Sequence, residues 1–167
     1  MRPRLIVLLT VALLLTACLQ NPLAVSGMSA EIGARGPEFT LEQLGGNAIS
    51  LSALQGQVVL INYWATWCGP CRLEMPIIQA RYNDGGFAVL AVNFDESAER
   101  VQRFVDELGL DFPVLLDPGG RVQEFYRVRG YPTSYFLDSE GIIRFIHIGE
   151  MSATDLDRYL TQLEINS

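Results

Sequence analysis

Two cysteines separated by two residues are the feature of this chain whose type and spacing suit chemistry best. Cys68 and Cys71 follow a nearly continuous apolar run at 58–65 and precede a stretch with helical periodicity. At the start of a helix, unpaired backbone N–H groups and the positive end of the helix dipole stabilise a thiolate over a thiol. The pattern therefore predicts that Cys68 attacks a disulfide and that Cys71, farther along the helix and more buried, resolves the product.

A CxxC pair can also be a structural disulfide or half of a zinc site. Besides this pair the chain has one cysteine, Cys18, and one histidine, His147. Cys18 lies in the expected export segment at the N-terminus, so the four nitrogen or sulfur ligands of a zinc site cannot be gathered from one chain. We predict no metal site and no cofactor other than the redox-active disulfide Cys68–Cys71, and we expect His147 to be structural.

The elements that must position the pair predict an α/β fold. Buried strands are expected at 58–65 and 87–94, and each leads into a helix, at about 71–83 and 97–108. The other expected elements are strands at 39–44, 49–54, 112–116, 133–137 and 142–148, and helices at 122–128 and from Ser152 onward. This order predicts a mixed central sheet with an N-terminal β-hairpin and helices on both faces.

The N-terminus is typical of an export signal. Arg2 and Arg4 precede an apolar run at 5–17, which is shorter than the roughly 20 residues that span a bilayer. The run ends in Leu15-Thr16-Ala17-Cys18, which resembles the lipobox of bacterial lipoproteins, where the cysteine is acylated and becomes the first mature residue. Cleavage elsewhere and an uncleaved signal anchor are the alternatives. All three place the domain outside the cytoplasm.

This pattern divides the chain into three parts. We expect a lipoprotein-type signal peptide at 1–17, a lipidated N-terminus with a flexible tether at 18–36, and a single domain at 37–167. The domain would then be anchored to a membrane of the cell envelope and face its extracytoplasmic side. Without Arg2 and Arg4 it would carry 10 basic and 19 acidic residues, a balance that disfavours nucleic-acid binding.

Around the cysteines the sequence resembles the thioredoxin superfamily. Trp67-Cys68-Gly69-Pro70-Cys71 matches its active-site motif, and the extension through Glu74 and Pro76 gives WCxPCxxExP, the pattern of the TlpA, ResA and CcmG branch of exported, membrane-attached disulfide reductases. The resemblance covers roughly residues 37–165. It implies a thioredoxin-like fold with a central helix-and-strand insertion at about 97–116.

The resemblance also implies which residues meet the substrate. Tyr131-Pro132 precedes a predicted strand and matches the family's cis-proline loop, which faces the active cysteines. The backbone of this loop is expected to pair with an extended substrate segment. Trp67, Gly69 and Pro70 are expected to contact the substrate as well.

Glu74 is the charged residue expected to take part in the reaction. On a helix it shares a face with Cys71, so it is carried toward the apolar side, where burial raises the pKa of a carboxyl group. In ResA-like proteins the residue at this place is thought to handle protons for the buried cysteine, and the resemblance implies that role for Glu74. Asn62 stands where thioredoxin has a buried aspartate. The simpler alternative for Glu74 is a solvated residue favoured by the helix dipole.

The function that the resemblance implies is that of an exported, membrane-tethered thiol-disulfide oxidoreductase. It would reduce disulfides of envelope proteins, such as the CxxCH cysteines of apocytochrome c, and a membrane electron donor of the DsbD or CcdA type would reset it. The Gly-Pro dipeptide resembles that of reducing thioredoxins, whose potential is about −270 mV against about −120 mV for the oxidant DsbA. The protein is expected to be a monomer.

Two alternative functions share this fold. The region 37–59 also resembles the start of the alkyl hydroperoxide reductases of the redoxin, or AhpC/TSA, group. A peroxiredoxin needs a threonine three residues and a proline seven residues before its cysteine, where this chain has Ala65 and Ile61. A copper chaperone of the Sco type uses a CxxxC spacing and a ligand histidine, so the CxxC spacing and the position of His147 disfavour it.

Overall fold

A mixed sheet of seven strands runs through the part of the chain that the computed structural model describes, residues 30–165. The strand order is β2-β1-β5-β4-β3-β6-β7. The parallel strands at its centre are β3 (Val59–Trp64), β4 (Ala88–Phe94) and β5 (Val114–Asp117). Antiparallel strands follow on both sides, with β6 (Thr133–Leu137) and β7 (Ile143–Ile148) beyond β3, and β1 (Thr40–Gln43) and β2 (Ala48–Ser50) beyond β5. The predicted mixed sheet is confirmed.

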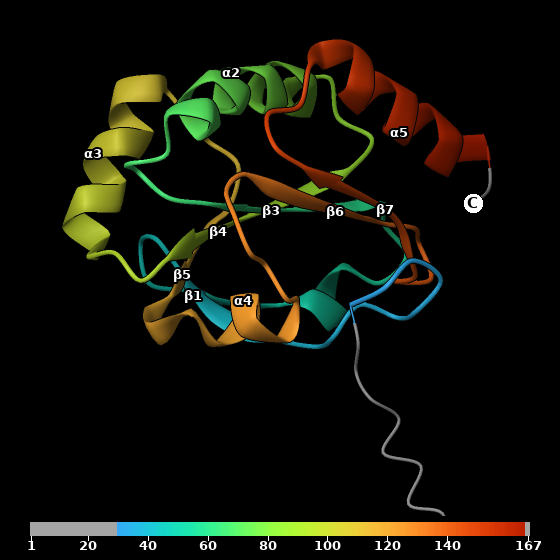
Figure 1. The fold of residues 1–167 in the computed structure, drawn as a ribbon, viewed down its shortest axis with the longest axis horizontal. Coiled ribbons are helices and arrows are strands. Elements are labelled where there is room, and N and C mark those ends of the chain that lie inside the picture. Colours follow the sequence, from blue (N-terminus) through green and yellow to red (C-terminus); the bar gives the residue numbers. More distant parts are fainter. Residues whose placement is uncertain (1–29, 166–167) are drawn as a thin grey trace, which may run out of the picture.

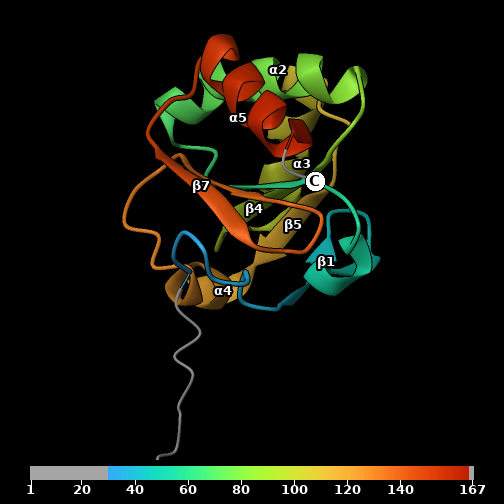
Figure 2. The ribbon, with the colours of Figure 1, turned by 90° about the vertical axis from the view of Figure 1, so that its right-hand side faces the viewer.

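Helices cover both faces of this sheet, as predicted (Figures 1 and 2). One face carries α2 (Gly69–Asn83), α3 (Ala98–Leu108) and α5 (Ala153–Ile165), and the other carries the short α4 (Arg121–Phe125). Ser152 and Asp155 cap α5 reciprocally, because each side chain accepts a hydrogen bond from the other residue's backbone N–H. This cap fixes where the chain enters α5 after leaving β7.

β3 is the strand that delivers the chain to the cysteines. All six of its residues are buried, since it lies between β4 and β6 and has a core on each face. Leu60 and Trp64 belong to the core under α2, α3 and α5, whereas Ile61 and Tyr63 belong to the opposite core. Burial on both faces explains why the sequence of this strand is an apolar run broken only by Asn62.

The helix and strand predicted as an insertion are α3 and β5. β5 pairs in parallel with β4 and antiparallel with β1, so the insertion joins the N-terminal hairpin to the central strands. On α3, Phe104 packs against Trp64 with 4.7 Å between ring centroids. The insertion therefore covers the end of the strand that leads into the cysteine motif.

Residues 30–36, which we predicted to be part of the tether, belong to the folded domain. The Gly33 backbone N–H donates to the Ile143 carbonyl at 2.8 Å. A Cβ atom on Gly36 would lie 2.8 Å from Leu137 Cδ2, so a side chain there would require neighbouring side chains to shift. The boundary that we placed at residue 37 was wrong because pairing with a distant strand leaves no periodic signal in a segment of small residues.

The second predicted strand is also shorter than expected. β2 ends at Ser50, and Leu51–Leu54 form a 3-10 turn, η1. The turn begins where the Leu51 N–H donates to the Phe39 carbonyl at 3.0 Å. An alternation of apolar residues over so short a segment fits a strand and a turn with one buried leucine equally well, so the sequence could not distinguish them.

The predictions of a signal peptide at 1–17, of lipidation at Cys18 and of the first part of the tether lie outside the described residues. Between residues 30 and 165, no helix combines the length and the apolar character needed to cross a membrane.

Candidate active site

Cys68 and Cys71 lie at the start of α2, directly after β3. They are joined in a disulfide with 2.02 Å between the two Sγ atoms. Cys68 is the N-cap residue of α2, and its sulfur accepts a hydrogen bond from the Cys71 N–H at 3.1 Å. Cys68 is 5% exposed, whereas Cys71 is fully buried. The geometry thus supplies a reachable sulfur at a helix N-terminus, where a thiolate is stabilised, with a second sulfur behind it.

Gly69 and Pro70 form the exposed first turn of α2. We predicted that the helix begins at Cys71, but it begins at Gly69. The proline is tolerated because the N–H that it lacks would have no partner within the first turn. Both intervening residues therefore lie on the outer side of the disulfide, where a substrate would approach.

The loop that precedes β6 lies beside the cysteine motif. The Tyr131–Pro132 peptide bond is cis, as predicted. The Tyr131 ring packs edge-on against the 63% exposed Trp67, with 5.5 Å between ring centroids. Within residues 30–165 the Tyr131 backbone forms no hydrogen bond, so its N–H and C=O are free to pair with an extended segment.

A hollow of about 410 Å³ adjoins this aromatic contact. The rings of Trp67, Phe94 and Tyr131 contribute to its wall. The Tyr131 hydroxyl donates to Gln123 Oε1 at 2.6 Å, and burial raises the pKa of Tyr131 to about 12. The hydroxyl therefore stays protonated and holds the ring in place, so the hollow has an aromatic part of its wall beside polar and charged side chains.

Glu74 is buried one helical turn beyond Cys71, and its carboxylate has two donors. Asn62 Nδ2 donates to Oε1 at 2.6 Å, and the Met151 backbone N–H donates to Oε2 at 2.7 Å. Glu74 is 1% exposed, and burial raises its pKa from 4.5 to about 7, although both hydrogen bonds lower it and the charge of Glu150 adds to the rise. The expected burial and raised pKa are confirmed, and the solvated alternative was wrong.

Asn62 connects Glu74 to the neighbouring strand. Besides Glu74, its Nδ2 donates to Ser134 Oγ on β6 at 2.9 Å. The other amide atom, Asn62 Oδ1, is buried and has no partner among the described residues. The amide atom that faces Glu74 is the donor Nδ2, so this hydrogen bond favours the ionised carboxylate, whereas burial favours the protonated carboxyl group. Such a group is suited to receiving and returning one proton near neutral pH.

Glu96 is a buried carboxylate near the site that the sequence analysis missed. Its side chain is 6% exposed and accepts from the Thr66 backbone N–H at 2.7 Å and from the Thr66 hydroxyl at 2.6 Å. Asn93 Nδ2 also donates to it at 2.8 Å. Because Thr66 precedes Trp67 and Cys68, Glu96 fixes the turn between β3 and α2. In the sequence it stands in a polar stretch after β4, where a solvated carboxylate is the usual expectation.

Glu96→Gln should lower the free energy of unfolding of the oxidised protein by about 1–3 kcal/mol. The amide offers one acceptor oxygen to three donors and turns its own NH₂ toward one of them. Urea unfolding measures the change. Glu99→Gln is the matched control, because Glu99 is exposed and pairs with the exposed Arg103, so its loss should cost less than about 0.5 kcal/mol. Equal losses for the two variants would contradict a positioning role of Glu96.

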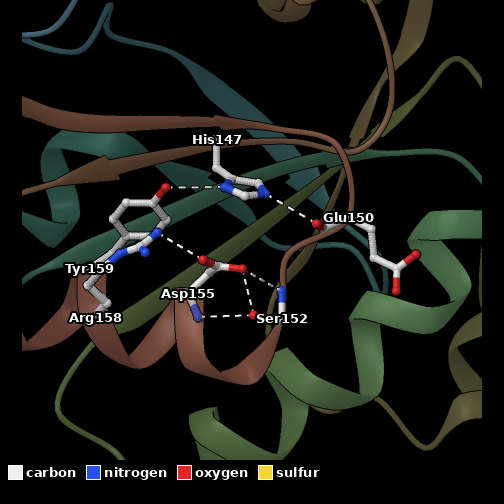
Figure 3. A network of polar contacts seen from close by, with 6 residues as sticks. All are labelled: His147, Glu150, Ser152, Asp155, Arg158 and Tyr159. Atoms are coloured by element: carbon white, nitrogen blue, oxygen red, sulfur yellow. Dashed lines mark hydrogen bonds and ion pairs between the residues drawn. The ribbon is translucent and has the colours of Figure 1, made fainter.

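The residues on which the alternative functions depend lie apart from the disulfide or lack the chemistry required. Ala65 is buried before the motif and offers no hydroxyl group to a peroxide. His147 uses both ring nitrogens elsewhere, since Nδ1 lies 3.2 Å from the Tyr159 hydroxyl and Nε2 lies 3.2 Å from the Glu150 carbonyl (Figure 3). Among residues 30–165, no three His, Cys, Asp or Glu side chains gather into a group that could hold a metal ion.

Known proteins resemble this chain over most of its length. The model of the AhpC/TSA family matches residues 32–146. The chain belongs to the AhpC/TSA family. Its family relatives include the thioredoxin-like protein YneN of Bacillus subtilis, which is 42% identical over 134 residues that cover 77% of this chain and 78% of YneN. The thiol-disulfide oxidoreductase ResA of Oceanobacillus iheyensis is 37% identical over 139 residues, 79% of this chain and 72% of that protein.

Solved structures agree with this membership of the AhpC/TSA family. The thiol:disulfide interchange protein DsbE from Chlorobium tepidum superimposes with a TM-score of 0.72 and 34% identity, over 80% of this chain and 97% of that one. With the paired cysteines at the start of α2, these relatives show that the protein is a thiol-disulfide oxidoreductase of the ResA and DsbE type, with a thioredoxin-like fold.

Proposed function

We propose that this protein is a reductase of disulfides in proteins of the bacterial cell envelope. The observation that carries the proposal is the pairing of a reachable Cys68 sulfur at a helix N-terminus with a buried Cys71 beside a protonatable Glu74. The exposed Trp67, the free Tyr131 backbone and the aromatic hollow next to them provide room for a polypeptide rather than for a small peroxide.

The proposed reaction starts from the reduced pair. The Cys68 thiolate attacks one sulfur of the substrate disulfide, the substrate S–S bond breaks, and a mixed disulfide forms while the other substrate sulfur leaves as a thiolate. Cys71 then gives up its proton and attacks Cys68 Sγ, which releases the second substrate thiolate and leaves Cys68 and Cys71 oxidised. Glu74, one turn away with a pKa of about 7, is suited to accept the proton from Cys71 and to release it when the pair is reduced again.

Several parts of this proposal rest on the sequence. The lipobox-like end at Cys18 supports a lipid anchor and a position on the extracytoplasmic side of a membrane. The Gly-Pro dipeptide and the resemblance to the ResA branch support electron flow from a membrane donor of the DsbD or CcdA type to the substrate. The same resemblance points to the CxxCH cysteines of apocytochrome c as one substrate class, acted on by a monomer with no cofactor other than its own disulfide.

Cys71→Ser should trap the substrate in cells. With the resolving thiol replaced, Cys68 remains bound to its target through a mixed disulfide. Disulfide-linked complexes, which a reducing agent cleaves, should therefore accumulate in the membrane fraction. Non-reducing electrophoresis and mass spectrometry would identify the attached proteins. The Cys68→Ser/Cys71→Ser variant is the control and should form none. If Cys71→Ser accumulates no complex, or if Cys68→Ser leaves the thiol status of envelope proteins unchanged, the reductase proposal is wrong.

A further inference from the structure

The loop between β7 and α5, residues 149–152, contacts the active site at two points. The Gly149 backbone N–H donates to the carbonyl of the cis residue Pro132 at 2.9 Å. The Met151 backbone N–H donates to Glu74 Oε2 at 2.7 Å, and the Met151 side chain is fully buried. One short segment therefore holds both the substrate-side loop and the carboxylate behind Cys71.

His147 holds this loop from the adjoining strand. Its Nε2 lies 3.2 Å from the carbonyl of Glu150, the residue between the two contact points, and its Nδ1 lies 3.2 Å from the Tyr159 hydroxyl on α5 (Figure 3). A carbonyl only accepts, so Nε2 carries the proton and donates. In the neutral imidazole, Nδ1 therefore accepts from Tyr159. The ring bridges β7, the loop and α5 with both nitrogens engaged.

We propose that His147 is a positioning residue for Glu74, acting through the Glu150 carbonyl to keep the Met151 N–H directed at the carboxylate. The inference rests on the proton-handling role proposed for Glu74. It assigns a function to the single histidine of the chain, which the sequence analysis treated as structural. Without the imidazole, the loop loses the side-chain hydrogen bond that fixes the carbonyl next to Met151.

The charged groups around His147 come from α5 and from the loop itself. Asp155 pairs with Arg158 at 2.8 Å, and the Arg158 guanidinium lies over the Tyr159 ring, 5.0 Å from its centroid. Hydrogen bonds from Ser152 lower the pKa of Asp155. These groups are arranged along the start of α5 (Figure 3), and the ion pair of Asp155 with Arg158 leaves the hydrogen bond of Nε2 to the Glu150 carbonyl intact.

The groups around Glu74 come from three other elements. β3 supplies Asn62, β6 supplies Ser134 behind Asn62, and the loop supplies the Met151 N–H together with the Glu150 charge. The Met151 hydrogen bond lowers the Glu74 pKa by more than the Glu150 charge raises it. With Met151 still buried, weakening this hydrogen bond removes the largest interaction that lowers the Glu74 pKa, so the titration of Glu74 shifts upward.

The test is a titration of Glu74 in the oxidised protein, where the disulfide-bonded cysteines do not titrate. Carbon-13 NMR of the Glu74 carboxyl, assigned with Glu74→Gln, measures its pKa. In His147→Phe, which keeps a ring against Tyr159, we expect a pKa higher by about half a unit to one unit. In the wild type the Met151 amide proton should shift with the same midpoint, and this coupling should be lost in His147→Phe.

Two further variants test whether the effect depends on the hydrogen bond to the Glu150 carbonyl. His147→Gln, whose amide can still donate to the Glu150 carbonyl, should restore most of the wild-type titration, and Ile148→Ala, at the exposed neighbouring position, should leave it unchanged. An unchanged or lowered Glu74 pKa in His147→Phe would overturn the inference. So would a Met151 amide proton in His147→Phe whose chemical shift still changes with the midpoint of the Glu74 titration. The titration needs no substrate, so its failure would leave the reductase function, tested by trapping, unaffected.

Discussion

The oxidised protein should lose about 3 kcal/mol of unfolding free energy between pH 4 and pH 8 because of Glu74 alone. The pKa of this carboxyl is about 7 in the folded protein against 4.5 as the ordinary value. Between these two values the folded state binds more protons than the unfolded state, so stability falls as the pH rises. The contribution is fully present below pH 4.5 and is lost as the pH rises through 7.

Glu74→Gln isolates this contribution, because an amide does not titrate. The variant gives up one hydrogen bond, because its NH₂ group cannot accept and only its carbonyl oxygen remains for the two donors from Asn62 and Met151, so it should be less stable than the wild type at pH 4. At pH 8 it should be the more stable protein. Guanidinium unfolding of both oxidised proteins over this pH range measures the difference in their unfolding free energies. In this difference the contributions of the other carboxylates cancel. A pH-independent difference would show that Glu74 titrates normally.

At pH 8 the unfolding free energy of oxidised Asn62→Asp should be about 4 kcal/mol lower than that of the oxidised wild type. The substitution replaces the donor that lies 2.6 Å from Glu74 Oε1 with a second carboxylate. Two carboxyl groups at this distance share one proton, and the pKa of the pair's remaining proton is raised strongly. Removing that proton at high pH leaves two buried like charges. Unfolding at pH 5 and pH 8 measures how the loss grows.

The double variant Asn62→Asp/Glu74→Gln is the control for this prediction. It exchanges the carboxylate and the amide across the same hydrogen bond, so one buried acid and one donor remain, with the acid now at residue 62. Most of the stability lost at pH 8 in the single variant should return. If the double variant is as unstable as Asn62→Asp alone, the loss comes from packing around residue 62 and not from the second charge.

The elements around the cysteines could be predicted from the sequence because their causes are local. A nearly continuous apolar run indicated β3, and helical periodicity after it indicated α2, so the cysteines were placed at a strand-to-helix junction. Pro70 in the first turn agreed with that start. The cis bond before Pro132 was a different kind of prediction, since it depended on resemblance to a family and not on any local pattern.

The errors occurred where distant segments decide the conformation. Residues 30–36 fold onto β7 and the sheet although nothing in their own sequence has a strand period. Leu51–Leu54 turn as a 3-10 helix although the Leu51 N–H bonds to the Phe39 carbonyl, which continues the register of the hairpin by one residue. Glu96 was missed for the same reason, since its partner Thr66 lies 30 residues away.

The sequence by itself determined the reactive pair, its place at the start of a helix and the family resemblance, because these depend on residues that are neighbours along the chain. The sequence also indicated a buried Glu74 with a raised pKa, but only the tertiary structure decided which donors hold its carboxylate. Its donors come from Asn62, 12 residues before it, and from Met151, 77 residues after it. A carboxyl pKa depends on burial and on such partners together. Folding β3, α2 and the loop held by His147 around one side chain therefore sets its proton affinity near neutral pH.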